Sequence, residues 1–365
     1  MIPLSGTRIV PGQRLPFDVF SAEGRLLLLR GNCIASQQDA ARLQSRGFYK
    51  PRPENRSTVF AACAKFSDRL AQIFEDVKAG GQGGSLSRRV KNLATELIET
   101  CDSDPDASFA SIHLDIQRTY LVVHSMMNAI VCCRLALASG LSREQRLSLV
   151  CAALTHDVGL LDLTDFINSR DKLTEAERAR VRQHVQQGIR MLGALGVVDP
   201  CWLDAIANHH EFLDGSGYLG KRGDELDASA RILALADSYS AMLRPRPYRD
   251  RLMARRALES LYSEGRDRYD GPLIEILIWD LGFYPPGSVL RLRNHELALA
   301  IRNSPGILDG PNVAAFTDST GCPLLHPVLR NTNDPEFGVL DVLDPALATR
   351  MGSQIAGCWA IAPRG

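Results

Sequence analysis

Histidine and aspartate are concentrated in one part of the chain. Five of the eight histidines lie between positions 124 and 210, each within a stretch that is otherwise apolar. They are His124, His156, His184, His209 and His210. Two aspartates share this setting: Asp157 follows His156 directly, and Asp237 lies among leucines and alanines on a predicted helix. These seven side chains are the candidates for chemistry.

Buried carboxylates and imidazoles point to metal binding. A carboxylate beside leucines is unfavourable unless it is paired with a cation, and imidazole is the commonest metal ligand near neutral pH. Any one such histidine is more often an ordinary core or surface residue. That explanation would have to hold separately for each of the five histidines and two aspartates. The sequence therefore favours a metal cluster.

Asp157 is the natural bridge between two cations, because a carboxylate offers two oxygens whereas an imidazole offers one free nitrogen. Neighbouring helical residues point about 100° apart, so His156 and Asp157 need not bind in the same direction. We expect His124, His156 and Asp237 to complete the shell of one metal, and His184, His209 and His210 that of the other. Nitrogen and carboxylate ligands without thiolate suit iron, manganese or zinc.

The order of these residues resembles a known family. It reads His124, His156-Asp157-Val158-Gly159, His184, His209-His210-Glu211, Asp214-Gly215-Ser216-Gly217-Tyr218 and Asp237. This pattern looks like the HD-GYP family of metal-dependent cyclic di-GMP phosphodiesterases. Residues 236–241 and 246–249 are also similar to the segment that follows the family's final aspartate, and the match covers roughly residues 110–290.

The resemblance implies a mainly α fold, with an all-helical HD-superfamily bundle as the catalytic domain. It implies hydrolysis of cyclic di-GMP to linear pGpG, and onward to GMP, by two divalent metal ions, iron or manganese, with zinc as a further option. Asp157 and His156 would be the catalytic residues. Implied partners are cyclic di-GMP and a diguanylate cyclase or other signalling protein.

Five residues are candidates for substrate binding. Gly215 and Gly217 would let the loop pass close to the metals, since glycine permits unusual backbone angles. Tyr218 would face the guanine or a phosphate, or alternatively pack the loop down. Arg246 and Arg249 are the best phosphate clamps, because guanidinium matches phosphate bidentately; the alternative is a solvated basic loop.

Three positions depart from the family pattern. Leu160 stands where the family has a phosphate-binding lysine, Leu219 replaces the proline of Gly-Tyr-Pro, and Tyr120 replaces a glutamate that binds a third metal. The last change implies two metals. The first two motivate a second hypothesis, a weak or inactive receptor that binds cyclic di-GMP or a partner protein without turnover. A third hypothesis is an enzyme with the same metal cluster that hydrolyses another phosphoester, since the fold does not fix the ligand.

The sequence predicts four segments. Residues 1–53 form a small β-rich unit with a hairpin around residues 21–24, and 54–105 a helical linker with a glycine-rich hinge at 80–84. Residues 106–285 form the helical metal-hydrolase domain, and 286–365 a β-rich C-terminal extension that starts with a hairpin around Asn294. The N-terminal unit suggests regulation or contacts in a homodimer.

Composition and charge limit the partners and the cellular location that the sequence predicts. With 42 basic and 42 acidic residues the formal net charge is zero, which disfavours a partner as anionic as a long nucleic acid. The longest uncharged stretch, 119–133, is too short and too polar for a membrane span. Nine cysteines without a Cys-x-x-Cys pair indicate reduced thiols rather than disulfides or a zinc site. No secretory signal is visible, and we expect a cytoplasmic protein.

Overall fold

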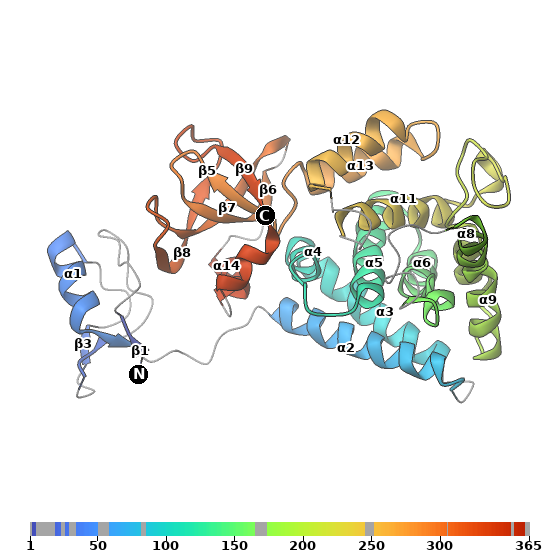
Figure 1. Ribbon diagram of the computed structural model, residues 1–365, viewed down its shortest axis with the longest axis horizontal. Helices are drawn as coiled ribbons and strands as arrows, with labels where there is room; N and C mark the ends of the chain where they lie inside the picture. The colour runs from blue at the N-terminus through green and yellow to red at the C-terminus, as the bar shows by residue number, and fades with distance from the viewer. Residues whose placement is uncertain are drawn as a thin grey trace. The chain divides into compact units, whose positions relative to one another are not determined.

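The computed structural model separates the chain into two compact units, Ala61–Pro285 and Met1–Phe60 together with Pro286–Gly365. The first unit is helical and carries all the candidate metal ligands (Figure 1). The structure describes residues 2–4, 19–22, 26–28, 34–49, 58–81, 85–164, 174–244, 252–304, 306–351 and 354–361.

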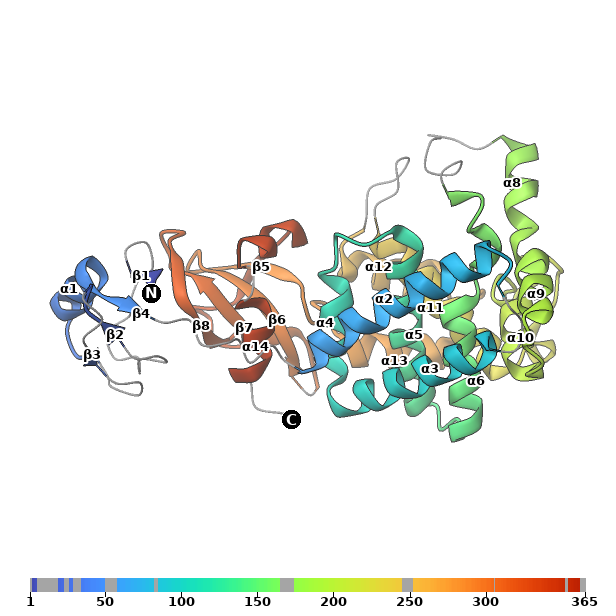
Figure 2. The ribbon, with the colours of Figure 1, turned by 90° about the horizontal axis from the view of Figure 1, so that it is seen from below.

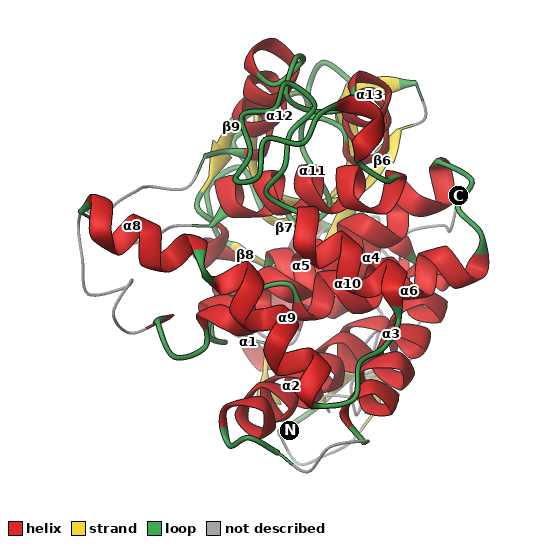
Figure 3. Cartoon of the chain, turned by 90° about the vertical axis from the view of Figure 1, so that its right-hand side faces the viewer, coloured by secondary structure: helices red, strands yellow, loops and turns green. Residues whose placement is uncertain are grey.

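The helical unit is a bundle arranged around one central helix, α5 (Figure 3). Helices α3, α4, α6, α11 and α13 all contact α5. The helices are α2 (Thr58–Lys78), α3 (Leu86–Ser103), α4 (Pro105–His113), α5 (Tyr120–Ala138), α6 (Arg143–Thr155), α8 (Glu175–Arg182), α9 (His184–Ala194), α10 (Pro200–Asn208), α11 (Ala228–Leu243), α12 (Ala254–Glu264) and α13 (Gly271–Leu281). Two short 3-10 turns, η1 (Val158–Leu160) and η2 (Gly223–Glu225), complete the unit.

Helix α5 is apolar all round because its neighbours cover every face. Each residue from Leu121 to Ala136 is buried. By length and composition it could cross a membrane, but 89% of its apolar window is buried inside the helical unit, as in the core helix of a globular domain. Its buried Arg134 is compensated by Asp280, with an Nη2–Oδ1 distance of 3.0 Å, and by Asp106 at 3.1 Å.

Helix ends place the candidate ligands. Helix α6 ends at Thr155 with His156 as its C-cap, and α10 ends at Asn208 with His209 as its C-cap. Thr174 and Glu177 form a capping box that starts helix α8, and a break at Gln183 makes His184 the first residue of α9. The ends of α6 and α10 and the start of α9 therefore determine where the imidazoles of His156, His209 and His184 project.

The structure differs from the predicted helical linker over residues 54–105. Helix α3 packs against α4, α5 and α6, and Val90, Leu93 and Leu97 on it are fully buried. Apolar residues at this spacing form a stripe that must be covered, so residues 61–105 belong to the compact helical unit. Residues 82–84 of the predicted hinge lie outside the described residues.

The other unit contains the β structure. Its N-terminal part holds β1 (Ile2–Pro3), β2 (Val19–Phe20), β3 (Leu26–Leu28), α1 (Gln37–Arg46) and β4 (Phe48–Tyr49). The predicted hairpin around residues 21–24 appears as antiparallel β2 and β3.

The C-terminal part is a five-stranded antiparallel sheet in the order β8-β7-β6-β5-β9, with α14 (Gln354–Ile361) against β6 and β8 (Figure 2). The strands are β5 (Val289–Leu292), β6 (Leu297–Ser304), β7 (Ile307–Thr317), β8 (Pro323–Asn331) and β9 (Val339–Leu343), followed by the 3-10 segment η3 (Pro345–Met351). The predicted fold class, mainly helical with a β-rich C-terminal extension, is confirmed.

Replacing Leu93 tests whether α3 belongs to the core. Leu93→Ala should lower the free energy of unfolding by about 2–5 kcal/mol, because it opens a cavity in a packed interior. Leu137→Ala is the matched control, since that leucine is 62% exposed. Urea unfolding followed by circular dichroism measures both. Equal, small effects would mean that α3 is only a linker.

Candidate metal centre

The seven candidate ligands come together from five parts of the helical unit. His124 lies on α5, His156 and Asp157 follow α6, His184 starts α9, His209 and His210 follow α10, and Asp237 lies on α11. Five of these side chains are nearly inaccessible; the exceptions are Asp237 and His210, with side chains 14% and 24% exposed. The cluster is therefore largely buried, and its most accessible members are Asp237 and His210.

One group of donors surrounds His124 and His156. The Nε2 of His124 lies 2.8 Å from Asp237 Oδ1 and 3.7 Å from Asp157 Oδ2. The Nε2 of His156 lies 3.4 Å from Asp157 Oδ2 and 3.6 Å from Asp237 Oδ1. Two ligands of one metal, each about 2.1 Å from it at ordinary angles, are about 3.0–3.4 Å apart. These separations fit a shared cation with small adjustments.

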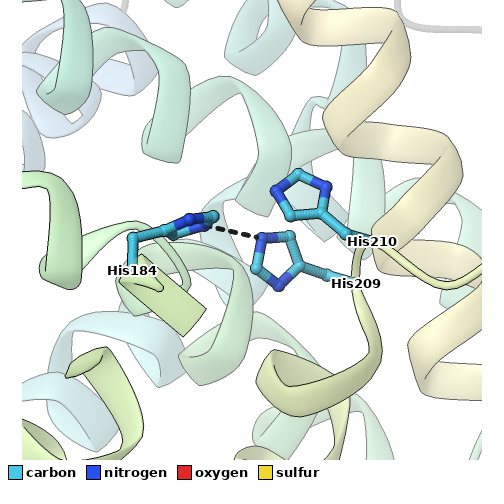
Figure 4. A group of neighbouring side chains, drawn as sticks. All are labelled: His184, His209 and His210. Atoms are coloured by element: carbon cyan, nitrogen blue, oxygen red, sulfur yellow. Dashed lines mark hydrogen bonds between the residues drawn. The ribbon is translucent and has the colours of Figure 1, made fainter. Parts of the chain in front are cut away.

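A second group consists of His184, His209 and His210 (Figure 4). One ligand atom from each lies within 4.8 Å of the others. The Nε2 atoms of His184 and His209 are 3.4 Å apart. The sequence analysis assigned the same three histidines to one metal, and the structure brings them together.

Asp157 lies between the two groups. Its Oδ2 faces His156 and His124, whereas its Oδ1 is 3.4 Å from the Nε2 of His184. Each carboxylate oxygen thus points to a different set of imidazoles, as a bridging ligand requires.

Backbone hydrogen bonds fix the protonation of three imidazoles. The Nδ1 atoms of His156, His184 and His209 face the carbonyl oxygens of the residues three positions earlier, at 2.9, 2.7 and 2.7 Å. A carbonyl only accepts, so each Nδ1 carries a proton and Nε2 is the ring nitrogen that can bind a cation. Such hydrogen bonds orient metal-bound histidines generally. The Nε2 atoms of His184 and His209 face each other at 3.4 Å, a separation that suits two nitrogen ligands of one cation.

The negative charges of Asp157 and Asp237 are balanced by a proton on a neighbouring imidazole. Burial alone would raise the pKa of Asp157 and Asp237, but the surrounding imidazoles outweigh it and hold both pKa values well below the ordinary range. Burial also lowers the pKa of His156, yet Asp157 and Asp237 reverse this and raise it to about 9. Without a metal, His156 therefore carries the compensating proton.

His209 and His210 behave in the opposite way. Burial, with neighbouring His210 and His156, holds the pKa of His209 well below its usual value, and burial lowers the pKa of His210 to about 4, against the pull of Asp237. Both rings are neutral at physiological pH. They therefore meet the requirement that a metal-binding imidazole be unprotonated.

A backbone contact sets the distance between the two groups. A Cβ at Gly159 would lie 2.1 Å from the carbonyl oxygen of His184 and 2.9 Å from the amide nitrogen of Gly188. Only glycine lets η1, which follows Asp157, approach the first turns of α9 this closely. This contact holds Asp157 opposite His184.

The loop after His210 is held by Glu211, whose role the sequence analysis did not predict. The buried carboxylate of Glu211 accepts hydrogen bonds from the backbone amides of Leu219, at 2.7 Å, and Lys221, at 3.0 Å. A Cβ at Gly217 would lie 2.5 Å from the Cα of Glu211. A glutamate directly after the two histidines was the available sequence signal, but nothing in it indicates loop binding.

The predicted substrate-binding residues divide into two sets. Gly215, with φ +81°, and Gly217 shape the loop, and the Tyr218 ring lies 4.7 Å from that of His210. Arg182, which the sequence analysis did not single out, has its guanidinium carbon 5.9 Å from the Tyr218 ring centre. The predicted phosphate clamps Arg246 and Arg249 lie outside the described residues.

The three departures from the family pattern also have definite positions. Leu160 is half-buried at the end of η1, and its amide donates to the carbonyl of Asp157 at 2.9 Å. Leu219 is 59% exposed. Tyr120 stacks on the His124 ring, 5.1 Å between centroids. An aromatic ring therefore stands where the family's third-metal glutamate would stand.

Comparison with known proteins agrees with this geometry. Residues 115–273 match the model of an HD domain. The chain is 28% identical to the cyclic di-GMP phosphodiesterase PA4108 of Pseudomonas aeruginosa over 262 residues, which are 70% of this chain and 61% of that relative. It is 35% identical to the 3'3'-cGAMP-specific phosphodiesterase 3 of Vibrio cholerae over 206 residues, 53% of this chain and 44% of the relative. The matches thus span less than two thirds of both relatives.

A solved structure has the same fold. Bd1817, a HDG"Y"P protein from Bdellovibrio bacteriovorus, superposes with a TM-score of 0.51 at 16% identity, covering 76% of this chain and 97% of that one. This likeness shows the fold. The HD-domain match over residues 115–273 and the cyclic-dinucleotide phosphodiesterase relatives support an HD-GYP family domain.

Removing one imidazole should empty part of the centre. We expect His184→Ala to weaken the binding of one of two Mn²⁺ ions by at least about tenfold, the least that loss of a supporting group usually costs. The control is His113→Ala, which removes a histidine of α4 that stacks on Phe109. Chelator competition with metal analysis measures both, and unchanged binding in His184→Ala would contradict the assignment.

Removing the Glu211 carboxylate should release the loop. In Glu211→Ala the amides of Leu219 and Lys221 lose their acceptor, so trypsin should cut after Lys221 or Arg222 several times faster than in the wild type. Asp224→Ala, an exposed acidic residue just beyond, is the control. Mass spectrometry of the fragments identifies the cleavage site. Equal cleavage rates in all three proteins would show that Glu211 does not hold the loop.

Proposed function

We propose that this protein is a two-metal phosphodiesterase that hydrolyses cyclic di-GMP to linear pGpG, and onward to GMP, in bacterial second-messenger signalling. The observation that carries the proposal is the position of Asp157, with one oxygen toward each imidazole group. The names of the relatives, which include cyclic di-GMP and 3'3'-cGAMP phosphodiesterases, support the substrate class.

The donor set favours two divalent ions. His124, His156 and Asp237 would hold one, His184, His209 and His210 the other, and Asp157 both. Nitrogen and carboxylate donors suit iron or manganese, with zinc as a further option. Such a pair, when bound, makes water nucleophilic at neutral pH and stabilises the attacking and leaving oxygens of a displacement at phosphorus.

The chain's own residues position the reactants. Asp157 accepts a hydrogen bond from the attacking water and orients it, and His156 keeps its Nε2 aimed at the centre through its hydrogen bond to Ala153. Gly215 and Gly217 keep the loop close to the centre, and Tyr218 beside His210 offers a face for a guanine. Arg246 and Arg249 are proposed to clamp the phosphates.

A receptor without turnover is the second candidate. The observation that favours it is Leu160, an aliphatic residue three positions after Asp157 where the family has a phosphate-binding lysine, together with the exposed Leu219. Such a protein would bind cyclic di-GMP or a partner protein. Hydrolysis of another phosphoester is a third option, since one relative is specific for 3'3'-cGAMP.

We also propose the cellular setting. The protein would act in the cytoplasm, where cyclic di-GMP is made, with a diguanylate cyclase or other signalling protein as a partner. The β-rich N-terminal segment would serve regulation or contacts in a homodimer.

Turnover tests the leading proposal. Protein loaded anaerobically with iron or manganese should linearise cyclic di-GMP, and Asp157→Ala should lower the rate more than about 100-fold, the scale on which loss of one transition-state contact acts. The exposed Asp162→Ala is the control. Chromatography distinguishes pGpG from GMP, with 3'3'-cGAMP as the competing substrate. Activity that survives in Asp157→Ala would argue against the mechanism.

A lysine at position 160 separates enzyme from receptor. If the missing cation limits turnover, Leu160→Lys should raise the rate of hydrolysis about tenfold or more, because an ammonium group would face the phosphate. Leu160→Met controls for side-chain length. Tight binding with no product in any of the three proteins, whichever metal is supplied, would favour the receptor.

A further inference from the structure

Asn128 is a polar residue in the buried central helix α5. It lies one turn after His124 on α5, is fully buried, and has Met127 and Ala129 as neighbours in the chain. Its amide oxygen is buried without a hydrogen-bond partner. Burying an unsatisfied carbonyl costs free energy, so the position calls for an explanation other than packing.

The amide group of Asn128 reaches the first group of candidate ligands. Its Nδ2 lies 3.3 Å from the Nε2 of His124 and 3.2 Å from the Nε2 of His156. It is also 3.4 Å from Oδ1 of Asp237. One atom of Asn128 is thus close to three donors that would share a cation, at the separations expected between ligands of one metal.

The protonation of the neighbouring imidazoles determines whether the amide nitrogen or the amide oxygen of Asn128 faces the candidate ligands. The Nδ1 of His156 donates its proton to the carbonyl of Ala153, so Nε2 is the nitrogen that a cation would bind. An amide N–H can donate to Nε2 only while that nitrogen carries neither a proton nor a metal. Once the imidazoles bind a cation, an amide nitrogen at this point faces positive charge and has lost its acceptors. A half-turn about the last side-chain bond exchanges the amide nitrogen and oxygen without moving the rest of the residue.

We propose that Asn128 is a ligand of the cation held by His124, His156, Asp157 and Asp237, binding it through the amide oxygen. The proposal rests on the proposed two-metal function. It accounts for an asparagine at this buried position and for a carbonyl oxygen that otherwise has no partner.

The additional oxygen makes the two metal positions unequal. The first cation has five protein donors, His124, His156, Asp157, Asp237 and Asn128, whereas the second has four. Five donors including three oxygens suit a six-coordinate ion such as Mn²⁺ or Fe²⁺ better than tetrahedral zinc. Because the amide is neutral, it adds a ligand without reducing the positive charge that attracts a phosphodiester.

Three variants of the full-length chain test the proposal. Asn128→Leu removes the oxygen at similar volume, and Asn128→Asp keeps an oxygen ligand and adds charge. Asn208→Leu is the matched control: Asn208 is equally buried and precedes His209, but its amide nitrogen donates to Asp204, at 2.9 Å to Oδ1 and 3.0 Å to the carbonyl oxygen. The readouts are Mn²⁺ affinity by chelator competition and the visible absorption of the Co²⁺-loaded proteins, which increases as coordination number falls.

In Asn128→Leu we expect one Mn²⁺ ion to bind about 10–100-fold more weakly and the Co²⁺ absorption to increase. The second ion should bind as in the wild type, which also shows that the variant is folded. Asn128→Asp and Asn208→Leu should retain both ions.

Contrary results are distinguishable. Two ions bound as tightly in Asn128→Leu as in the wild type, with an unchanged spectrum, would overturn the proposal and leave the phosphodiesterase function intact. Loss of the ion in Asn128→Asp as well would also overturn it, because an N–H donor to Asp237 is destroyed by that change whereas a ligating oxygen is not. A wild type that binds no divalent metal would refute the proposed function itself.

Discussion

Two carboxylates buried among imidazoles constrain the rest of this structure. Asp157 and Asp237 are held ionised, with pKa values well below the ordinary range, inside a helical bundle. Negative charge in such surroundings needs a positive partner within a few ångströms. The partner is a proton on His156 or a metal cation, and the two compete for the same nitrogen. The helices around the pocket serve to keep these few atoms facing one another.

Precision in the pocket comes from backbone rather than from long side chains. Three imidazoles are anchored by Nδ1 hydrogen bonds to carbonyls in the last turn of the helix that precedes each of them, and Gly159 brings Asp157 against α9. Glu211 does the same for the adjoining loop, because its carboxylate binds backbone amides. Each of these contacts requires a helix to stop at a particular residue, which connects helix capping to the geometry of the centre.

Much of this arrangement was predictable from sequence, for a physical reason. Ligand-type residues such as His184 and Asp237 stand out because charge and imidazole are rare on apolar faces, and their grouping follows from the two oxygens of Asp157. Asn128 and Glu211 were missed because an amide or a glutamate carries no such pattern. Their roles depend on which atoms α6, α11 and the 212–222 loop bring beside them. The structure differs from the predicted linker over residues 54–105 because Leu93 is buried by helices whose packing against α3 the local sequence does not indicate.

The contact between Gly159 and the start of α9 has a consequence for substitutions at the site. Since the spacing between the two halves of the pocket is set by main-chain atoms, exchanging a side chain that faces the ligand leaves the frame in place. A single replacement of a side chain near the centre, such as the one at Leu160, therefore changes the chemistry of the site without changing the spacing between the two groups of ligands.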